Sequence, residues 1–110
     1  MKNLLDERRF LNKGGHHSTA AICSVVNFDE EDIFYSPIEV QFSISDCSRV
    51  ITLSIDVSTV DELENSLFKL QQLIDVSEST KKCLEENRGI IENFEERKKL
   101  EKQKNGRSTV

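Results

Sequence analysis

The sequence predicts an α+β fold in which a three-stranded antiparallel β-meander is covered by a C-terminal helix with a long helical extension. Residues 38–57 alternate apolar and polar side chains on both sides of a short polar centre, which is the period of half-buried strands. Residues 20–28 form another run rich in β-branched residues. From residue 59 onward the apolar residues change to helical spacing.

The bulk composition predicts one domain. The chain has 110 residues, of which 36% are hydrophobic and 32% charged, enough for one modest core and a well-solvated remainder. The net charge of −5 argues against general nucleic-acid binding. We divide the expected single domain into an N-terminal arm at 1–15, the meander at 16–57, a helical region at 58–104 and a disordered tail at 105–110.

The cysteines and the apolar runs predict a cytoplasmic protein without membrane contact. Cys23, Cys47 and Cys83 are odd in number and form no Cys-x-x-Cys pair, which argues against a disulfide framework and a four-thiolate zinc site. No apolar run approaches the roughly 20 residues that span a bilayer, and the N-terminus shows no secretory signal. We expect no metal and no cofactor.

The N-terminal part contains an arm and the first predicted strand. Leu4, Leu5, Phe10 and Leu11 stand among charged residues, which suits either a short amphipathic helix or an arm that docks on the core. The strand at 20–28 follows. Its apolar face is expected to contain Ala20, Ile22, Val26 and Phe28.

The hairpin at 38–57 has a well-specified register. If Ile44 lies opposite Ile51, eight apolar side chains share one face, whereas a slip of one residue mixes the faces. A two-residue loop of Cys47 and Ser48 is a poor match to the residues of a type I′ turn, so we expect a four-residue loop from Asp46 to Arg49. The other expected pairs are Phe42 with Leu53, Val40 with Ile55 and Ile38 with Val57.

Helix signals begin with a capping box, in which Thr59 is the N-cap and Glu62 the third helical residue, although Ser58 with Asp61 fits equally well. An apolar stripe of Leu63, Leu67, Leu70 and Ile74 then follows, and we expect it to cover the hairpin. The pattern weakens at 75–80, where the helix either continues or breaks. We expect a second, interrupted stripe to form a homodimer; its residues are Cys83, Ile90, Ile91 and Phe94.

Two polar segments are candidates for binding a small anionic ligand or nucleotide. Glycines and hydroxyls in 14–19 can present N–H and O–H donors, although no lysine follows and a strand replaces the helix of a phosphate loop. The second segment is the hairpin tip at 45–49. The candidate ligand-binding residues are Gly15, His16, His17, Ser18, Asp46, Cys47, Ser48 and Arg49.

The same residues allow a Cys/His-dependent enzyme as another alternative. Cys47 would be the nucleophile, and a nearby imidazolium of His16 or His17 would favour its thiolate. The competing interpretation is a glycine-hinged connection and an ordinary turn, and it is the one we favour. We therefore assign no catalytic residue and expect a non-enzymatic protein.

Five segments are considered together: Phe10-Leu11-Asn12, residues 15–22, Ile44-Ser45-Asp46-Cys47-Ser48-Arg49, Asn65-Ser66-Leu67 and Lys69-Leu70. With these segments the chain resembles small uncharacterised proteins of bacteria, their prophages and other mobile elements. The resemblance covers roughly residues 4–74, and because no activity is defined for that group it carries over no functional residue. It implies a small binding or regulatory protein that modulates a host system, such as defence, by contacting an unknown host protein.

Overall fold

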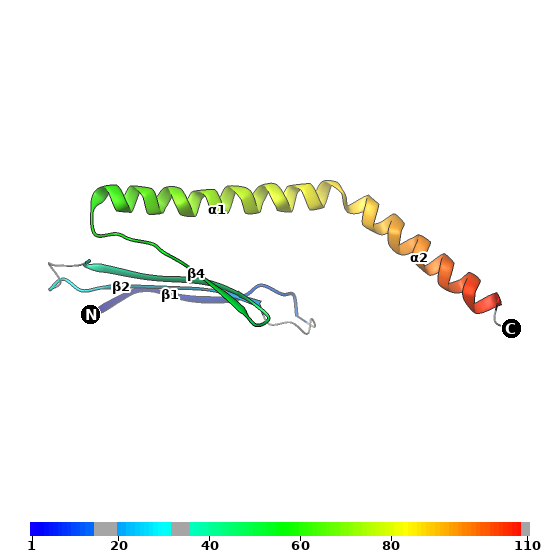
Figure 1. Cartoon of the computed structure of the whole chain (residues 1–110), viewed down its shortest axis with the longest axis horizontal. Coiled ribbons are helices and arrows are strands. Elements are labelled where there is room, and N and C mark those ends of the chain that lie inside the picture. Colours follow the sequence, from blue (N-terminus) through cyan, green and yellow to red (C-terminus); the bar gives the residue numbers. More distant parts are fainter. Residues whose placement is uncertain (15–19, 32–35, 109–110) are drawn as a thin grey trace. The chain divides into compact units, whose positions relative to one another are not determined.

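The computed structural model describes residues 1–14, 20–31 and 36–108 and confirms the α+β class. Four antiparallel strands form one sheet in the order β1-β2-β3-β4 (Figure 1). The chain separates into two compact units, Met1–Lys69 and Leu70–Val110, so its organisation as a single domain stays a prediction. The elements are β1 (Lys2–Phe10), β2 (Ala20–Phe28), β3 (Ile38–Asp46), β4 (Arg49–Leu53), α1 (Val60–Glu86) and α2 (Arg88–Ser108).

The predicted count of three strands is wrong, because the expected N-terminal arm contains strand β1. It pairs with β2 so that Leu5 lies opposite Val26 and Arg9 opposite Ile22. A bulge between Asn3 and Leu5 shifts the register. A bulge inserts an extra residue and interrupts the two-residue alternation by which a strand is recognised.

Strand β2 has the predicted bounds and shares an apolar face with β3. Ile22 lies opposite Ile44, Val26 opposite Val40, and Phe28 opposite Ile38. The other face is mostly polar, with Cys23 opposite Ser43 and Val25 opposite Gln41. This register agrees with the predicted apolar face of β2. Burial does not distinguish that face, because Ala20 and, on the other face, Ala21 are only 5% and 4% exposed, and the remaining side chains on both faces are half-buried.

The register of β3 and β4 is confirmed only near the turn. Phe42 pairs with Leu53 and Ile44 with Ile51, but β4 ends at Leu53, so the expected pairs of Ile55 and Val57 are wrong. Residues 54–57, here called the connector, are held by α1 instead. The carbonyl of Ser54 accepts a hydrogen bond from Lys69 Nζ at 2.7 Å, and that of Asp56 accepts one from Ser66 Oγ at 2.9 Å.

Helix α1 begins where the capping box predicts. The Glu62 N–H donates to Thr59 Oγ1 at 3.1 Å, and the Leu63 N–H donates to the Thr59 carbonyl at 2.9 Å, so Thr59 is the N-cap. The Glu62 carboxylate accepts from Ser58 Oγ at 2.6 Å and from the Ser58 N–H at 3.3 Å. The cap therefore extends one residue beyond the standard capping box.

The two helices are separated at Asn87, and α1 continues through residues 77–80 without a break (Figure 1). The backbone N–H and the side-chain Nδ2 of Asn87 both donate to the Cys83 carbonyl, at 3.2 and 2.7 Å. These bonds satisfy one of the carbonyls that a helix end leaves without a helical partner. No helix in the described part of the chain is long and apolar enough to cross a membrane.

The described chain has a very small core. Its buried apolar residues are Ala20, Ala21 and Ile55, and within residues 1–14, 20–31 and 36–105 no side chain is less than 2% exposed. Many large apolar side chains are exposed instead, on the helices in particular. Folded chains normally bury many such groups, so the described part of this chain exposes an unusually large share of its apolar side chains.

Candidate functional site

The hairpin tip is an exposed two-residue turn. Asp46 pairs with Arg49 across the ladder, which leaves Cys47 and Ser48 as the loop and shows that the expected four-residue loop is wrong. Cys47 has a φ of 55°, the left-handed conformation that both common hairpin turns need at their first loop position. All four residues are exposed, and no side-chain hydrogen bond or ion pair joins any two of them. The tip thus has the geometry of a tight turn.

The other candidate ligand residues, Gly15, His16, His17 and Ser18, lie outside the described residues. Their proximity to Cys47 therefore stays a prediction. The register of β2 and β3 places Ala20 opposite Asp46, so the chain enters β2 at the same end of the sheet as the turn between β3 and β4. The anion site and the Cys/His enzyme remain alternatives that these residues neither support nor contradict.

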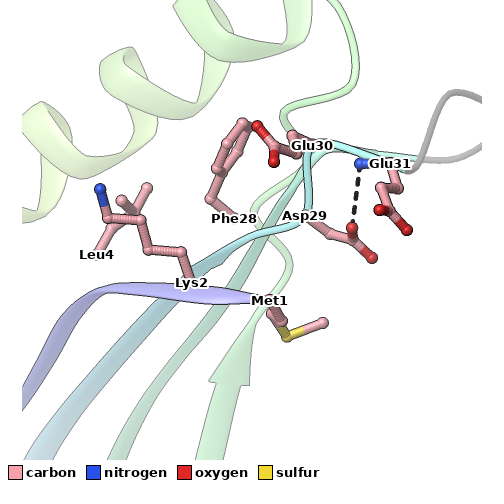
Figure 2. A pocket seen from close by; sticks show the side chains of 7 residues that line it. All are labelled: Met1, Lys2, Leu4, Phe28, Asp29, Glu30 and Glu31. Atoms are coloured by element: carbon pink, nitrogen blue, oxygen red, sulfur yellow. Dashed lines mark hydrogen bonds between the residues drawn. The ribbon is translucent and has the colours of Figure 1, made fainter.

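An open hollow of about 670 Å³ lies where β1 begins and β2 ends (Figure 2). The Asp29 carboxylate accepts a hydrogen bond from the Glu31 N–H at 3.1 Å, so it serves the local turn. Figure 2 shows the carboxylates of Asp29, Glu30 and Glu31 spread around that turn without meeting at one point. In the described ranges, no group of three or more His, Cys, Asp or Glu side chains is arranged to hold a metal ion.

The start of α1 faces the connector with its polar side. Ser66 is only 4% exposed and Lys69 is half-buried, and both donate to connector carbonyls. Leu63 and Leu67, by contrast, are 40% and 57% exposed. The expectation that this apolar stripe packs against the hairpin is therefore wrong at these two leucines, because hydrogen bonds hold a different face of the helix against the chain.

The second stripe lies in the unit Leu70–Val110, where its apolar side chains are open to solvent. Ile90, Ile91 and Phe94 are 65%, 61% and 61% exposed, and Cys83 is exposed as a free thiol. Lys98 Nζ lies 5.9 Å from the centre of the Phe94 ring, a cation–π contact on the same surface. The described side chains beyond Leu73 in this unit are all exposed.

The candidate functional site consists of two exposed apolar faces, that of Leu63 and Leu67 on α1 and the second stripe. The sequence indicated only the second stripe as a contact surface. The spacing of the second stripe already suggested an intermolecular contact. The exposure of Leu63 and Leu67 was missed, because spacing identifies an apolar face without identifying what covers it. Comparisons of the chain with protein-family models, with curated proteins and with solved structures find no match.

Proposed function

We propose that the protein is a small non-enzymatic binding protein that acts through protein–protein contacts and forms a homodimer through its second stripe. The observation that carries the proposal is the exposure of Ile90, Ile91 and Phe94, each above 60%. The residues of this contact are Cys83, Ile90, Ile91 and Phe94.

The energetics of α2 support a partner. Full burial of an apolar side chain such as Ile90 or Phe94 contributes about 1.5–3 kcal/mol. Within the chain, α2 gains support from exposed ion pairs such as Arg88 Nε to Glu92 Oε1 at 2.8 Å, each worth about 0.3–0.5 kcal/mol. Most helical stability in proteins comes from packing an apolar face, so a second copy would supply what the single chain lacks.

The regulatory part of the proposal rests on the resemblance to small proteins of bacteria, prophages and mobile elements. A chain with little buried core and exposed helix faces suits a role in which it contacts a host protein. A pull-down from the native host, with wild-type protein and with the double variant described next, would identify that partner. We expect the variant to lose the partner if the second stripe also contributes to that contact.

Sedimentation velocity over a concentration series tests the homodimer. We expect wild-type protein to be dimeric and Ile90→Glu/Phe94→Glu to raise the dissociation constant at least about a hundredfold, because the apolar burial is lost on both chains. The matched control is Leu100→Glu. Leu100 is 54% exposed but lies roughly 120° around the helix from Phe94, so its substitution should leave the dimer intact.

A wild-type chain that is monomeric at all concentrations would contradict the homodimer. If Leu100→Glu raises the dissociation constant as much as the double variant does, the added negative charge, and not the loss of the second stripe, weakens the dimer. Circular dichroism of each variant distinguishes lost association from lost helix.

A further inference from the structure

We infer that helix α1 also pairs with its counterpart in a second copy, as a parallel, in-register coiled coil. The inference rests on the self-association proposed above but assigns it a separate surface and an orientation. This surface, called the α1 seam, consists of Val60, Leu63, Leu67, Leu70 and Ile74.

The α1 seam has coiled-coil spacing. Its residues are separated by three, four, three and four positions, which is the heptad pattern of alternating d and a positions. The a positions are Val60, Leu67 and Ile74, and the d positions are Leu63 and Leu70. Branched residues at a with leucine at d favour two parallel strands.

The α1 seam is also accessible. Val60 is 73% exposed, Leu67 57%, Ile74 49% and Leu63 40%, whereas Leu70 is half-buried. The connector is held by Ser66 and Lys69, which lie roughly 80° and 140° around the helix from the centre of the seam. The hydrogen-bonded face is therefore centred away from the apolar face, although Ser66 is the g position beside the seam. The connector leaves Val60, Leu67 and Ile74 open to another helix.

The flanking charges determine the orientation. Three of the four e positions of α1 are glutamates, Glu64, Glu78 and Glu85, whereas the g positions from Ser66 onward carry no charged side chain. An antiparallel pair places e against e and so opposes carboxylates, which is unfavourable. A parallel pair places each e position against a g position and avoids this repulsion.

The seam weakens beyond Ile74, where Ser77 and Lys81 occupy the next d and a positions. The Lys81 ammonium lies 3.7 Å from a Glu85 carboxylate oxygen of the same chain, which reduces the repulsion between two opposed lysines. A single polar a position lowers stability but fixes the register of a pair. Parallel α1 helices also bring their C-terminal ends together, and with them the starts of both α2 helices.

Disulfide crosslinking of the full chain tests the inference. Single cysteines at Leu63→Cys or Leu70→Cys are placed in a Cys23→Ser/Cys47→Ser/Cys83→Ser background whose circular dichroism matches wild type. Under mild oxidation each variant alone should convert almost completely to a covalent dimer, because identical d positions meet only in a parallel, in-register pair. Gln72→Cys, which is exposed and lies on the far side of the helix, should remain mostly uncrosslinked.

Three results would overturn the inference. The first is crosslinking of Gln72→Cys as fast as Leu63→Cys. The second is crosslinking only in a mixture of Leu63→Cys and Leu67→Cys chains, which indicates an antiparallel pair, because antiparallel helices place d positions against a positions. The third is no crosslinking in a protein that sedimentation shows to be dimeric. The last result leaves the second-stripe homodimer standing. Conversely, Leu63→Cys and Leu70→Cys could both crosslink while Ile90→Glu/Phe94→Glu leaves the dissociation constant unchanged. That result would exclude the second stripe as the dimer contact and support the α1 seam in its place.

Discussion

Ser66 Oγ donates a hydrogen bond of 2.9 Å to the carbonyl of Asp56, and Ser66 is the buried residue of helix α1. A helix usually buries an apolar side chain at such a contact. Here a hydroxyl binds a backbone carbonyl of the connector, ten residues earlier in the chain. This bond, together with that from Lys69 to Ser54, explains both the early end of β4 and the outward position of the apolar stripe.

Replacing Ser66→Ala removes the donor to the Asp56 carbonyl. We expect the free energy of unfolding to fall by about 1 kcal/mol, because a partly buried carbonyl loses its partner. Urea unfolding followed by circular dichroism measures the change. Asn65→Ala, at the exposed neighbouring position, should cause no loss. Equal values for the two variants would show that the hydrogen bond does not stabilise the fold.

The N-cap predicts a second stability effect. Thr59→Ala should lower the free energy of unfolding by about 1 kcal/mol, because the Glu62 N–H loses its acceptor. Thr59→Ser keeps a hydroxyl at the same position and should retain most of the stability. Thermal unfolding of the three proteins measures the difference. If Thr59→Ser is as unstable as Thr59→Ala, the lost stability comes from the threonine methyl group and not from the hydroxyl that caps the helix.

The turn at Cys47 predicts a stabilising substitution. Its φ of 55° strains most side chains, whereas asparagine adopts this region more readily. Cys47→Asn should therefore raise the free energy of unfolding by about 0.5–1 kcal/mol. Ser48→Asn is the matched control, because Ser48 has no positive φ and should gain nothing. A larger gain from Ser48→Asn would contradict this account of the turn.

Gly89 lies near the start of α2 with open space where a Cβ would stand. Gly89→Ala should therefore stabilise α2 by about 1 kcal/mol through helix propensity. Hydrogen exchange of the α2 amides should slow, and the helical circular dichroism signal should increase. Gly14 has equally open surroundings but lies outside any helix, so Gly14→Ala should leave both signals unchanged. Unchanged exchange in Gly89→Ala would show that helix propensity at this position does not limit the stability of α2.

Regular periods and local chemistry made part of this fold predictable from sequence. Strand β2 and the central register of the hairpin follow from the two-residue alternation, and Thr59 follows from its spacing to Glu62. These features depend on residues near one another in the chain.

The features that were not predicted depend on a bulge or on distant residues. Strand β1 was missed because residues 6–9 are all charged and all its side chains are exposed, so no apolar alternation marks it, and the bulge shifts its register. The end of β4 depends on Ser66 and Lys69, ten and fifteen residues away from the carbonyls they bind. Turn preferences alone also did not reveal that Cys47 would accept a left-handed conformation.

The bulge of β1 has a consequence for how copies of the chain meet. An edge strand offers unpaired backbone groups to any neighbouring strand, and bulges and charges are the features that discourage such pairing. Strand β1 has both, since the run Asp6-Glu7-Arg8-Arg9 follows the bulge. At the opposite edge, β4 is only five residues long. Sheet-to-sheet growth into aggregates is thereby disfavoured, which suits the proposed association through the helices.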